Sequence, residues 1–307
     1  MTKPRLTFID LFAGIGGTRI AFESAGFRCV FSSEWDKHSQ QTYEANFGEK
    51  PHGDISEIAA SEIPDFDILV AGFPCQPFSS IGQRKGFEHK TQGTLFFDIA
   101  RIIGEKKPTA VLLENVKGLT NHDGGKTWQI IRETLEDMGY TVCAKVLNSK
   151  YYGVPQSRER IYIVAFKDAK VAAQFSFPSE SSKTIGIGKF VETGVKDRPI
   201  SVHLQKSYIF KIDDGRPEII TTETDAPVKT LVASYHKIQR LTGTFVMDKQ
   251  TGLRLLSEAE CKAIMGFPKD FVVPVSRTQM YRQFGNSIAV PVVTKIAKAM
   301  NAALGAN

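Results

Sequence analysis

A short apolar strand that runs directly into a glycine-rich turn opens the sequence: Phe8-Ile-Asp-Leu-Phe-Ala-Gly-Ile-Gly-Gly17. Such a turn lets a ligand approach the backbone closely, and the segment after it is typical of a helix. Short β-rich runs, each followed by an amphipathic segment, lie at residues 6–10, 28–33, 67–71 and 109–114. This alternation predicts an α/β fold with a parallel sheet covered by helices on both faces, and ligands bound beyond the carboxyl ends of the strands.

The loops that leave three of these strands carry unusual residues, and we expect them to align at one edge of the sheet. They are Phe12-Ala-Gly-Ile-Gly-Gly17, Gly72-Phe-Pro-Cys-Gln-Pro77 and Glu114-Asn-Val116. From about residue 177 the pattern loosens into short β-branched runs broken by Gly, Pro and Asp, which indicates a smaller β-rich domain. The expected division is residues 1–176, 177–275 and 276–307, the last segment returning to the first domain.

The 307 residues carry a formal net charge of +6, which favours a polyanionic partner but is also common in proteins with no nucleic-acid role. There is no signal-peptide core, and no segment approaches the apolar length of a membrane span, so we expect a cytoplasmic protein. The four cysteines, at 29, 75, 143 and 261, lie far apart with no CxxC pair. This spacing argues against a zinc site or a disulfide framework, and no metal is expected.

The glycine-rich turn predicts a nucleoside site. Glu34, at the end of the second strand, is placed to accept hydrogen bonds from ribose hydroxyls, and Trp35 to pack on an adenine ring. Asp54 is placed to accept from the adenine amino group. A dinucleotide site or a simple helix cap remains the alternative for the glycines alone, although Phe12 in place of the first glycine argues against a dinucleotide.

Cys75 is the one cysteine with a local argument for reactivity. It follows the buried-looking strand at 67–71, and Pro74 and Pro77 stiffen the loop that presents its thiol. Glu114 ends another apolar strand and is expected at the same edge of the sheet. An inert cysteine remains the alternative for this loop alone.

Two arginines, Arg158 and Arg160, precede the strand predicted at 161–166. Residues i and i+2 of an extended segment point to one side, so the two guanidinium groups are expected to converge on a base carbonyl or a phosphate. A solvated charge run is the alternative for this motif alone.

Together these motifs resemble those of the bacterial DNA cytosine-5 methyltransferases of type II restriction-modification systems, in the usual order and over nearly the whole chain. The resemblance rests on Phe12-Ala-Gly-Ile-Gly16, Pro74-Cys75-Gln76, Glu114-Asn115-Val116, Gln156-x-Arg158-x-Arg160 and Gly285-Asn286-Ser287. It implies a Rossmann-like S-adenosylmethionine-dependent methyltransferase sheet with a smaller, β-rich target-recognition domain at residues 177–275.

The resemblance also implies roles for particular residues. The catalytic residues would be Cys75, Glu114, Arg158 and Arg160. The S-adenosylmethionine pocket would include Phe12, Gly14, Gly16, Glu34, Trp35, Asp54, Ile55, Leu95 and Asn286. The DNA-binding residues would be Ser79, Thr230, Leu231, Lys237, Gln239 and Arg240, with phosphate contacts or solvated surface as the alternative for each of the last three.

The pair of Cys75 and Glu114 suggests a mechanism. Thiolate addition at carbon 6 of cytosine gives an enamine whose carbon 5 can take a methyl group, while Glu114 hydrogen-bonds ring nitrogen 3 and the exocyclic amine. A cytosine inside a duplex hides carbon 6, so the nucleotide has to be flipped out. S-adenosylhomocysteine would be the second product.

Double-stranded DNA is the expected partner, bound by a monomer, and the resemblance leaves room for a cognate restriction endonuclease acting on the same site. Three alternatives remain open: a transfer RNA cytosine methyltransferase on the same scaffold, a catalytically silent DNA-binding protein, and a nicotinamide-dependent oxidoreductase. Assays on both nucleic acids, and ligand binding with both cofactors, discriminate among them.

Overall fold

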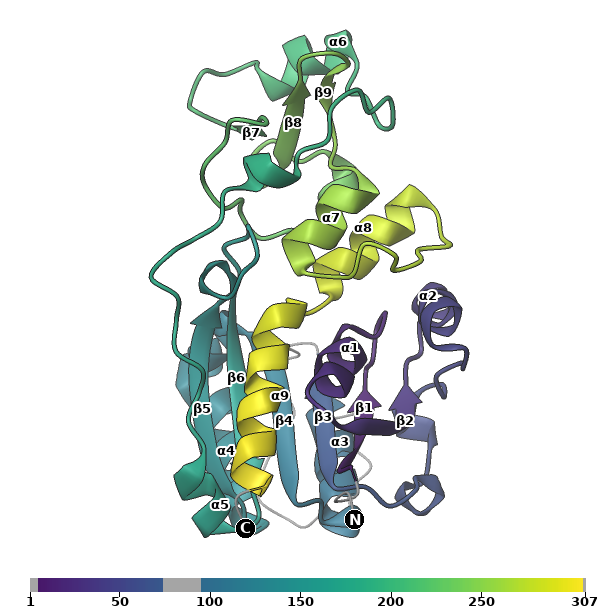
Figure 1. Cartoon of the computed structure of the whole chain (residues 1–307), viewed down its shortest axis with the longest axis vertical. Helices are drawn as coiled ribbons and strands as arrows, with labels where there is room; N and C mark the ends of the chain where they lie inside the picture. The colour runs from purple at the N-terminus through teal and green to yellow at the C-terminus, as the bar shows by residue number, and fades with distance from the viewer. Residues whose placement is uncertain (1–4, 74–94, 306–307) are drawn as a thin grey trace. The chain divides into compact units, whose positions relative to one another are not determined.

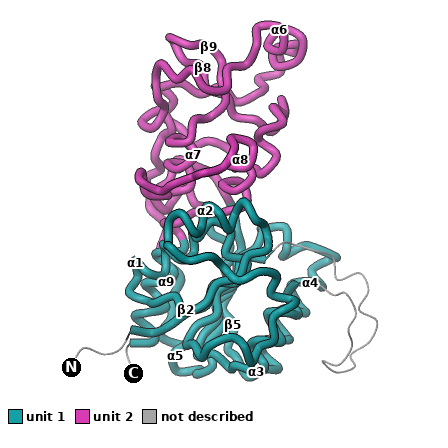
Figure 2. Tube along the Cα trace, turned by 90° about the vertical axis from the view of Figure 1, so that its right-hand side faces the viewer, with its two compact units in different colours: residues 1–147, 159–178, 293–307 teal, residues 148–158, 179–292 magenta. Residues whose placement is uncertain are grey.

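The computed structural model describes residues 5–73 and 95–305 (Figure 1). The chain divides into two compact units, which are shown in different colours in Figure 2. Unit 1 comprises residues 1–147, 159–178 and 293–307, and unit 2 comprises residues 148–158 and 179–292.

Unit 1 is built on a six-stranded sheet with the strand order β2-β1-β3-β4-β6-β5. Strands β2, β1, β3 and β4 run parallel, whereas β6 is antiparallel to β4. The expected α/β fold class is confirmed, and the strands predicted from the sequence lie within two residues of those observed. The strands are β1 (Thr7–Leu11), β2 (Arg28–Ser33), β3 (Ile68–Gly72), β4 (Ala110–Val116), β5 (Thr141–Asn148) and β6 (Glu159–Phe166).

Helices cover both faces of this sheet (Figure 1). On one face, Leu69 and Leu113 belong to a buried cluster with Ile99 of α3 and Ile131 of α4. On the other face, Phe8 meets Phe22 of α1 with ring centroids 5.0 Å apart. The helices of unit 1 are α1 (Gly17–Ser24), α2 (Lys37–Phe47), α3 (Leu95–Lys106), α4 (Lys126–Asp137), α5 (Ala169–Gln174) and most of α9 (Val290–Gly305).

Local sequence signals set where several helices begin and end. The Asp36 carboxylate accepts from the Ser39 N–H at 2.8 Å and caps the first turn of α2, which ends at Gly48 with a φ of 72°. A capping box between Ser257 and Glu260 starts α7 (Glu258–Met265) in unit 2. These caps satisfy backbone groups that the helix itself leaves unpaired.

Unit 2 combines a three-stranded sheet, in the order β7-β8-β9, with two packed helices. Phe267, after α7, contacts Phe284 of α8 with ring centroids 5.4 Å apart. Its elements are α6 (Val202–Leu204), β7 (Glu218–Ile220), β8 (Thr244–Asp248), β9 (Gly252–Arg254), α7 (Glu258–Met265) and α8 (Arg277–Asn286).

The division of the chain differs from the expected one in two places. Residues 148–158 cluster with unit 2, and so do residues 276–292, which the sequence placed in the first domain. The reason is packing: buried Phe284 lies against Phe267, while Gly285 lies so close to Val232 and Ala233 that a Cβ would come within 2.6 Å of their backbone. The boundary expected at 176/177 lies two residues from the one observed.

A buried ion pair holds the centre of unit 2. The Arg254 guanidinium is fully buried and donates to both oxygens of Glu260, at 2.9 and 2.8 Å. The same carboxylate accepts the backbone N–H groups of Ser257 and Glu192, at 2.7 and 2.9 Å. Breaking one side of such a pair leaves a buried charge uncompensated.

We therefore expect Glu260→Ala to lower the free energy of unfolding by about 3–5 kcal/mol, the cost of removing one partner of a buried pair. Urea unfolding followed by circular dichroism measures the change. Glu223→Ala is the matched control, because its pair with Lys249 is largely exposed and contributes little. Equal midpoints for the two variants would contradict this assignment.

Among the described residues, the stretch Arg277–Gly305 is long and apolar enough to cross a membrane by length and composition only, with a mean hydropathy of 1.2 over a window of 18 residues. It comprises two helices, α8 with 10 residues and α9 with 16, and residues 287–289 lie between them. Half of that window is buried inside the protein, as in the core helix of a soluble protein.

Candidate functional site

The carboxyl end of β4 and the start of antiparallel β6 bring a carboxylate and a guanidinium together. Gly72, the last residue of β3, is in register with Glu114 of β4, and Val116 is in register with Arg160 of β6. The Arg160 Nε lies 3.2 Å from a carboxylate oxygen of Glu114, and both side chains are only 15% exposed. The sequence reasoning placed Glu114 at this edge, and the structure adds the guanidinium beside it.

Asn115 ties this edge to the loop that follows β3. Its side-chain amide donates to the Phe73 carbonyl at 2.9 Å, and its own oxygen accepts from the Val116 N–H at 2.8 Å. Phe73 is the last residue described before the gap, two positions ahead of Cys75. Cys75 and Ser79 themselves lie outside the described residues.

The glycine-rich turn adopts a conformation that most residues avoid. Phe12, Gly14 and Gly16 have φ values of 58°, 56° and 86°, in the left-handed region. A Cβ on Gly14 would meet no atom within 4 Å, so the turn leaves open space at that position. The Gly14 N–H donates to Glu34 at 2.8 Å, which joins the turn to the end of β2.

Glu34 is almost completely buried, and burial raises the pKa of its carboxyl group. The backbone N–H groups of Asp36 and Gly14 oppose this shift, because hydrogen bonds stabilise the charged form. The Glu34 oxygens accept from the Gly14 and Asp36 N–H groups at 2.8 Å each, and the Trp35 N–H also bonds the carboxylate.

The other residues predicted for the cofactor pocket are distributed over both units. The Trp35 ring is 72% exposed beside Glu34, and the Asp54 carboxylate accepts from the Ser56 N–H at 2.9 Å. Ile55 is buried behind Asp54, and Leu95 is the partly buried first residue of α3. Asn286 is exposed and belongs to unit 2.

Arg158 is placed differently from Arg160. It is 3% exposed, lies in unit 2, and donates to the carbonyls of Leu231, Gly285 and Ser287 at 3.3, 3.2 and 2.7 Å. The partners of Arg158 lie within unit 2, whereas Arg160 faces Glu114 of unit 1. β6 begins at Glu159, so the alternation of a strand does not extend back to Arg158.

The predicted DNA-binding segment has an anchored start and an exposed middle. The Thr230 hydroxyl donates to the Ser157 carbonyl at 2.8 Å, and the N–H of buried Leu231 donates to the Gln156 amide oxygen at 2.7 Å. Beyond them, Lys237 is exposed on the surface of unit 2. Gln239 is exposed as well, whereas Arg240 is 6% exposed.

Asp10 is a buried acid that the sequence reasoning did not single out. Asp10 pairs with Val70 of the neighbouring strand β3, and strand alternation puts the Asp10 side chain on the same face of the sheet as Glu114. Among the described residues its two carboxyl oxygens have no hydrogen-bond partner. Burial raises its pKa well above the usual range, the positive charge of Arg19 opposes this shift, and the negative charge of Glu34 adds to it.

The raised pKa of the buried Asp10 carboxyl group predicts a pH-dependent effect on the stability of the folded protein. An acid whose pKa is raised by folding loses stability as pH rises from its unfolded value toward its folded value. Asp10→Asn removes that loss, so the melting temperature of the variant should exceed that of the wild type by a margin that grows with pH. Thermal unfolding across the pH range measures this, with exposed Asp65→Asn as the control. A margin that is constant with pH would contradict the assignment.

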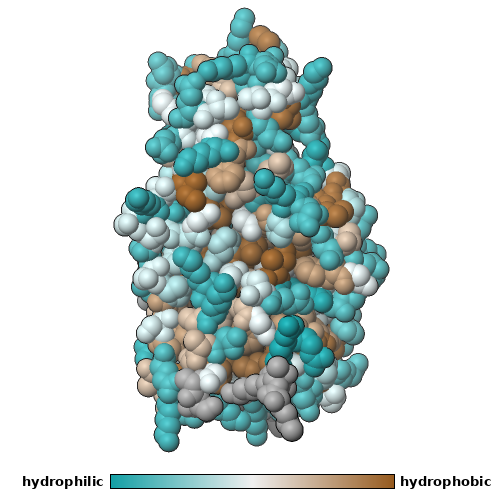
Figure 3. All heavy atoms as spheres, in the orientation of Figure 1, coloured by the Kyte–Doolittle hydropathy of each residue, from teal (hydrophilic) through white to brown (hydrophobic). Residues whose placement is uncertain are grey.

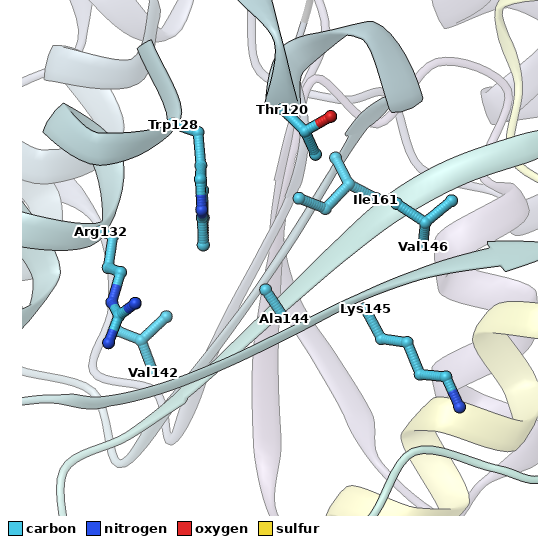
Figure 4. Close-up of a pocket in the computed structure, with 8 residues that line it drawn as sticks. All are labelled: Thr120, Trp128, Arg132, Val142, Ala144, Lys145, Val146 and Ile161. Atoms are coloured by element: carbon cyan, nitrogen blue, oxygen red, sulfur yellow. The ribbon is translucent and has the colours of Figure 1, made fainter. Parts of the chain in front are cut away.

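A pocket of about 340 Å³ in unit 1 lies between α4 and the strands β5 and β6 (Figure 4). Trp128 and Arg132 of α4 form one wall, and Val142 and Ile161 of the strands contribute the other. Ile161 belongs to the face of the sheet that packs on α3 and α4, opposite to Glu114. This pocket is therefore separate from the edge that holds Glu114.

Comparisons with known proteins place the chain in a family. The model of the C-5 cytosine-specific DNA methylase family matches residues 6–302. The type II methyltransferase M.MspI of Moraxella sp is 60% identical over 297 residues, covering 97% of this chain and 71% of the relative. M.BsuFI of Bacillus subtilis is 56% identical over 297 residues, covering 96% and 72%.

Solved structures share the fold. DNMT2 of Spodoptera frugiperda superposes with a TM-score of 0.79 at 21% identity, covering 96% of this chain and 99% of that one. A putative DNA modification methyltransferase encoded in an Escherichia coli prophage gives a TM-score of 0.76 at 19% identity, covering 98% and 99%. At this identity the likeness concerns the fold alone.

The sheet and the family match define a methyltransferase. The chain belongs to the C-5 cytosine-specific DNA methylase family, and it is a DNA cytosine-5 methyltransferase of the type II kind. The resemblance read from its motifs is thereby confirmed.

Proposed function

We propose that this chain methylates carbon 5 of a flipped-out cytosine in a short, specific duplex sequence, through a covalent adduct between Cys75 and carbon 6. The observation that supports it most is the meeting of Glu114 with Arg160 at the exit of β3, the strand that leads to Cys75. An acid held by a cation at a sheet edge is suited to bind a base that carries both a ring nitrogen and an amine.

The reaction begins when the Cys75 thiolate adds to carbon 6 of the ring. Glu114 hydrogen-bonds nitrogen 3 and the exocyclic amine, which keeps negative charge from building up on the ring. Carbon 5 then forms its bond to the incoming methyl group. Loss of the carbon 5 proton to a base and departure of the Cys75 thiolate restore the aromatic ring.

Arg160 contributes charge and position rather than a proton. Its Nε lies 3.2 Å from the Glu114 carboxylate, and its Nη1 donates to the Glu159 carbonyl at 2.8 Å. A guanidinium held in this way fixes the acid and leaves Nη2 to approach the base carbonyl. We give Arg158 a different role: its bonds to three carbonyls make it a residue that orders unit 2.

The cofactor proposed for this reaction is S-adenosylmethionine, and the residues of the turn fit it. Open space at Gly14, the Glu34 carboxylate at the end of β2 and the exposed Trp35 suit a nucleoside. Phe12, Gly16, Asp54, Ile55 and Leu95 complete the proposed pocket, and Asn286 is proposed from the resemblance alone. When bound, the cofactor supplies a methyl group on a sulfonium, and S-adenosylhomocysteine remains.

DNA recognition is proposed for unit 2, with Thr230 and Leu231 as the anchored start of the recognition segment and Lys237 and Gln239 as its exposed readers. Ser79 is proposed to contact DNA as well. We further propose that the enzyme acts as a monomer in the bacterial cytoplasm, as the modification partner of a restriction endonuclease that acts on the same site.

The experiment that tests this function supplies radiolabelled methyl donor with mixed-sequence duplex DNA and, in parallel, with transfer RNA. We expect label in the DNA, and sequencing should find 5-methylcytosine confined to one short motif. Label in transfer RNA alone would replace DNA as the substrate. No label in either, with cofactor binding demonstrated by calorimetry, would leave a catalytically silent binder and end the proposal.

A further inference from the structure

The pocket between α4 and the strands β5 and β6 is a slot with one aromatic wall. Figure 4 shows the ring of Trp128 edge-on, with Ile161 across the pocket from it. Trp128 is partly buried and packs against the core of unit 1, whereas Ile161 is 3% exposed and belongs to that core. Both walls are therefore held in place by core packing. The volume of about 340 Å³ is in the range of small-molecule sites.

The strand side of the slot is apolar because of the alternation along β5. Val142, Ala144 and Val146 share one face of this strand, and all three line the pocket. The short side chain of Ala144 keeps the middle of the slot open (Figure 4). On the face of the molecule drawn in Figure 3, by contrast, hydrophobic atoms lie in separate groups among hydrophilic ones, which is normal for a protein surface.

The two ionisable residues that line the slot are both basic. Arg132 lies one helical turn after Trp128, and its guanidinium is at one end of the slot, beside Val142 (Figure 4). Lys145 is on the opposite face of β5, and its side chain points away from Trp128 in the same view. Arg132 is therefore the cation that a ligand in the slot would meet.

Two carboxylates of α4 are close to Arg132 in the sequence, and neither lines the slot. Glu136 accepts from the Arg132 Nε at 2.7 Å, and Glu133 accepts from Gln129 at 2.8 Å. Among the described residues, Nη1 and Nη2 of Arg132 make no hydrogen bond. Two parallel N–H groups of a guanidinium are suited to bind both oxygens of a carboxylate or a phosphate.

We propose that the slot is a binding site for a planar aromatic anion, that is, a flat ring that carries a carboxylate or a phosphate. The ring lies between Trp128 and Ile161, and the anionic group bonds Nη1 and Nη2 of Arg132. Ile161 is on the face of the sheet opposite to Glu114, so this site is separate from the site proposed for the base. The inference does not depend on the proposed function.

The test is a titration of the full-length, nitrogen-15-labelled protein with naphthalene-2-carboxylate, with S-adenosylhomocysteine present to fill the cofactor pocket. The chain has two tryptophans, so its spectrum contains two indole N–H signals, and Trp128→Phe assigns them. The Trp128 signal should shift with saturation while the Trp35 signal stays in place. Naphthalene-2-carboxamide, which has the same ring without the charge, should bind about tenfold more weakly, the loss expected for one charge-assisted hydrogen bond.

Two variants test the residues of the slot. Ala144→Leu should fill the slot and abolish binding of the carboxylate, whereas Thr141→Leu, at an exposed position on the opposite face of β5, should leave it unchanged. Arg132→Gln should weaken binding of the carboxylate about tenfold and leave binding of the carboxamide unchanged. Lys126→Gln is its control, because it removes an exposed positive charge from the same helix outside the slot.

A Trp128 signal that does not move, or that moves without saturation, would overturn the proposal. So would equal affinities for the carboxylate and the carboxamide, wild-type binding by Ala144→Leu, or a shift of the Trp35 signal alone, which would place the probe in the cofactor pocket. A parallel titration with adenosine 5′-monophosphate separates the two sources of the ligand. Binding of both probes at Trp128 supports a site that also takes nucleotides, and binding of the carboxylate alone supports a site for aryl carboxylates.

Discussion

Cys75→Ala is expected to abolish methyl transfer to DNA while leaving the affinities for DNA and S-adenosylmethionine close to those of the wild type. The thiolate is the group that makes carbon 5 nucleophilic, and a methyl side chain has no electron pair to add to carbon 6. The binding surfaces proposed in unit 2 and around Glu34 do not include this thiol. Single-turnover methylation and equilibrium binding measure the two parts separately.

A covalent readout makes this prediction sharper. Duplex DNA with 5-fluorocytosine at the target carries fluorine where the departing proton would be, so the adduct with Cys75 cannot be resolved. The wild type should give a complex that survives denaturation, and Cys75→Ala should give none. Cys143→Ala is the control, since this thiol is free, half-buried on β5 and remote from the proposed chemistry. Methylation by Cys75→Ala at a near wild-type rate would contradict the proposed mechanism.

Glu114→Gln is expected to lower kcat by about 10²–10⁴-fold, the usual contribution of general acid–base catalysis, with little change in the KM for DNA. A glutamine amide can still donate to nitrogen 3 and accept from the exocyclic amine, so the flipped base is held. The amide is far too weak an acid to transfer a proton to the ring as charge develops. Arg160, 3.2 Å away, then faces a neutral group.

Steady-state kinetics with the target duplex give kcat and KM for this variant. Glu159→Gln is the matched control, because it makes the same substitution on β6, the strand next to that of Glu114. The Glu159 carboxylate pairs with Lys117 at 3.0 Å on the surface. A loss confined to KM would mean that Glu114 only binds the base. Equal losses in both variants would point to damage to the strand rather than to the acid.

The sheet was predictable because its signals are local. An apolar run of five or six residues followed by a glycine-rich or polar loop predicts a buried strand and its end, whatever the rest of the chain does. Parallel strands put their carboxyl ends at one edge, so Glu34 and Glu114 were expected there, and the register of Gly72 with Glu114 agrees. The motif order was sufficient to recognise the family.

The hydrogen-bond partners of the arginines could not be predicted from local sequence in the same way. Arg158, Arg160 and Arg240 look alike in the sequence, yet one bonds carbonyls from residues 231 to 287, one faces an acid, and one clamps a loop. Those partners lie 24 to 129 positions away along the chain. Only the tertiary structure brings such groups together.

The amino-acid sequence by itself therefore determined the α/β fold, and it also predicted the edge of the sheet and the residues that we propose for catalysis, because each depends on neighbours within a few positions. The tertiary structure decided which charges are free to act. Asp10 is buried without a hydrogen-bond partner among the described residues, and the Arg240 guanidinium donates to backbone carbonyls. The free energy of a charged group depends on its burial and its partners, and long-range packing sets both.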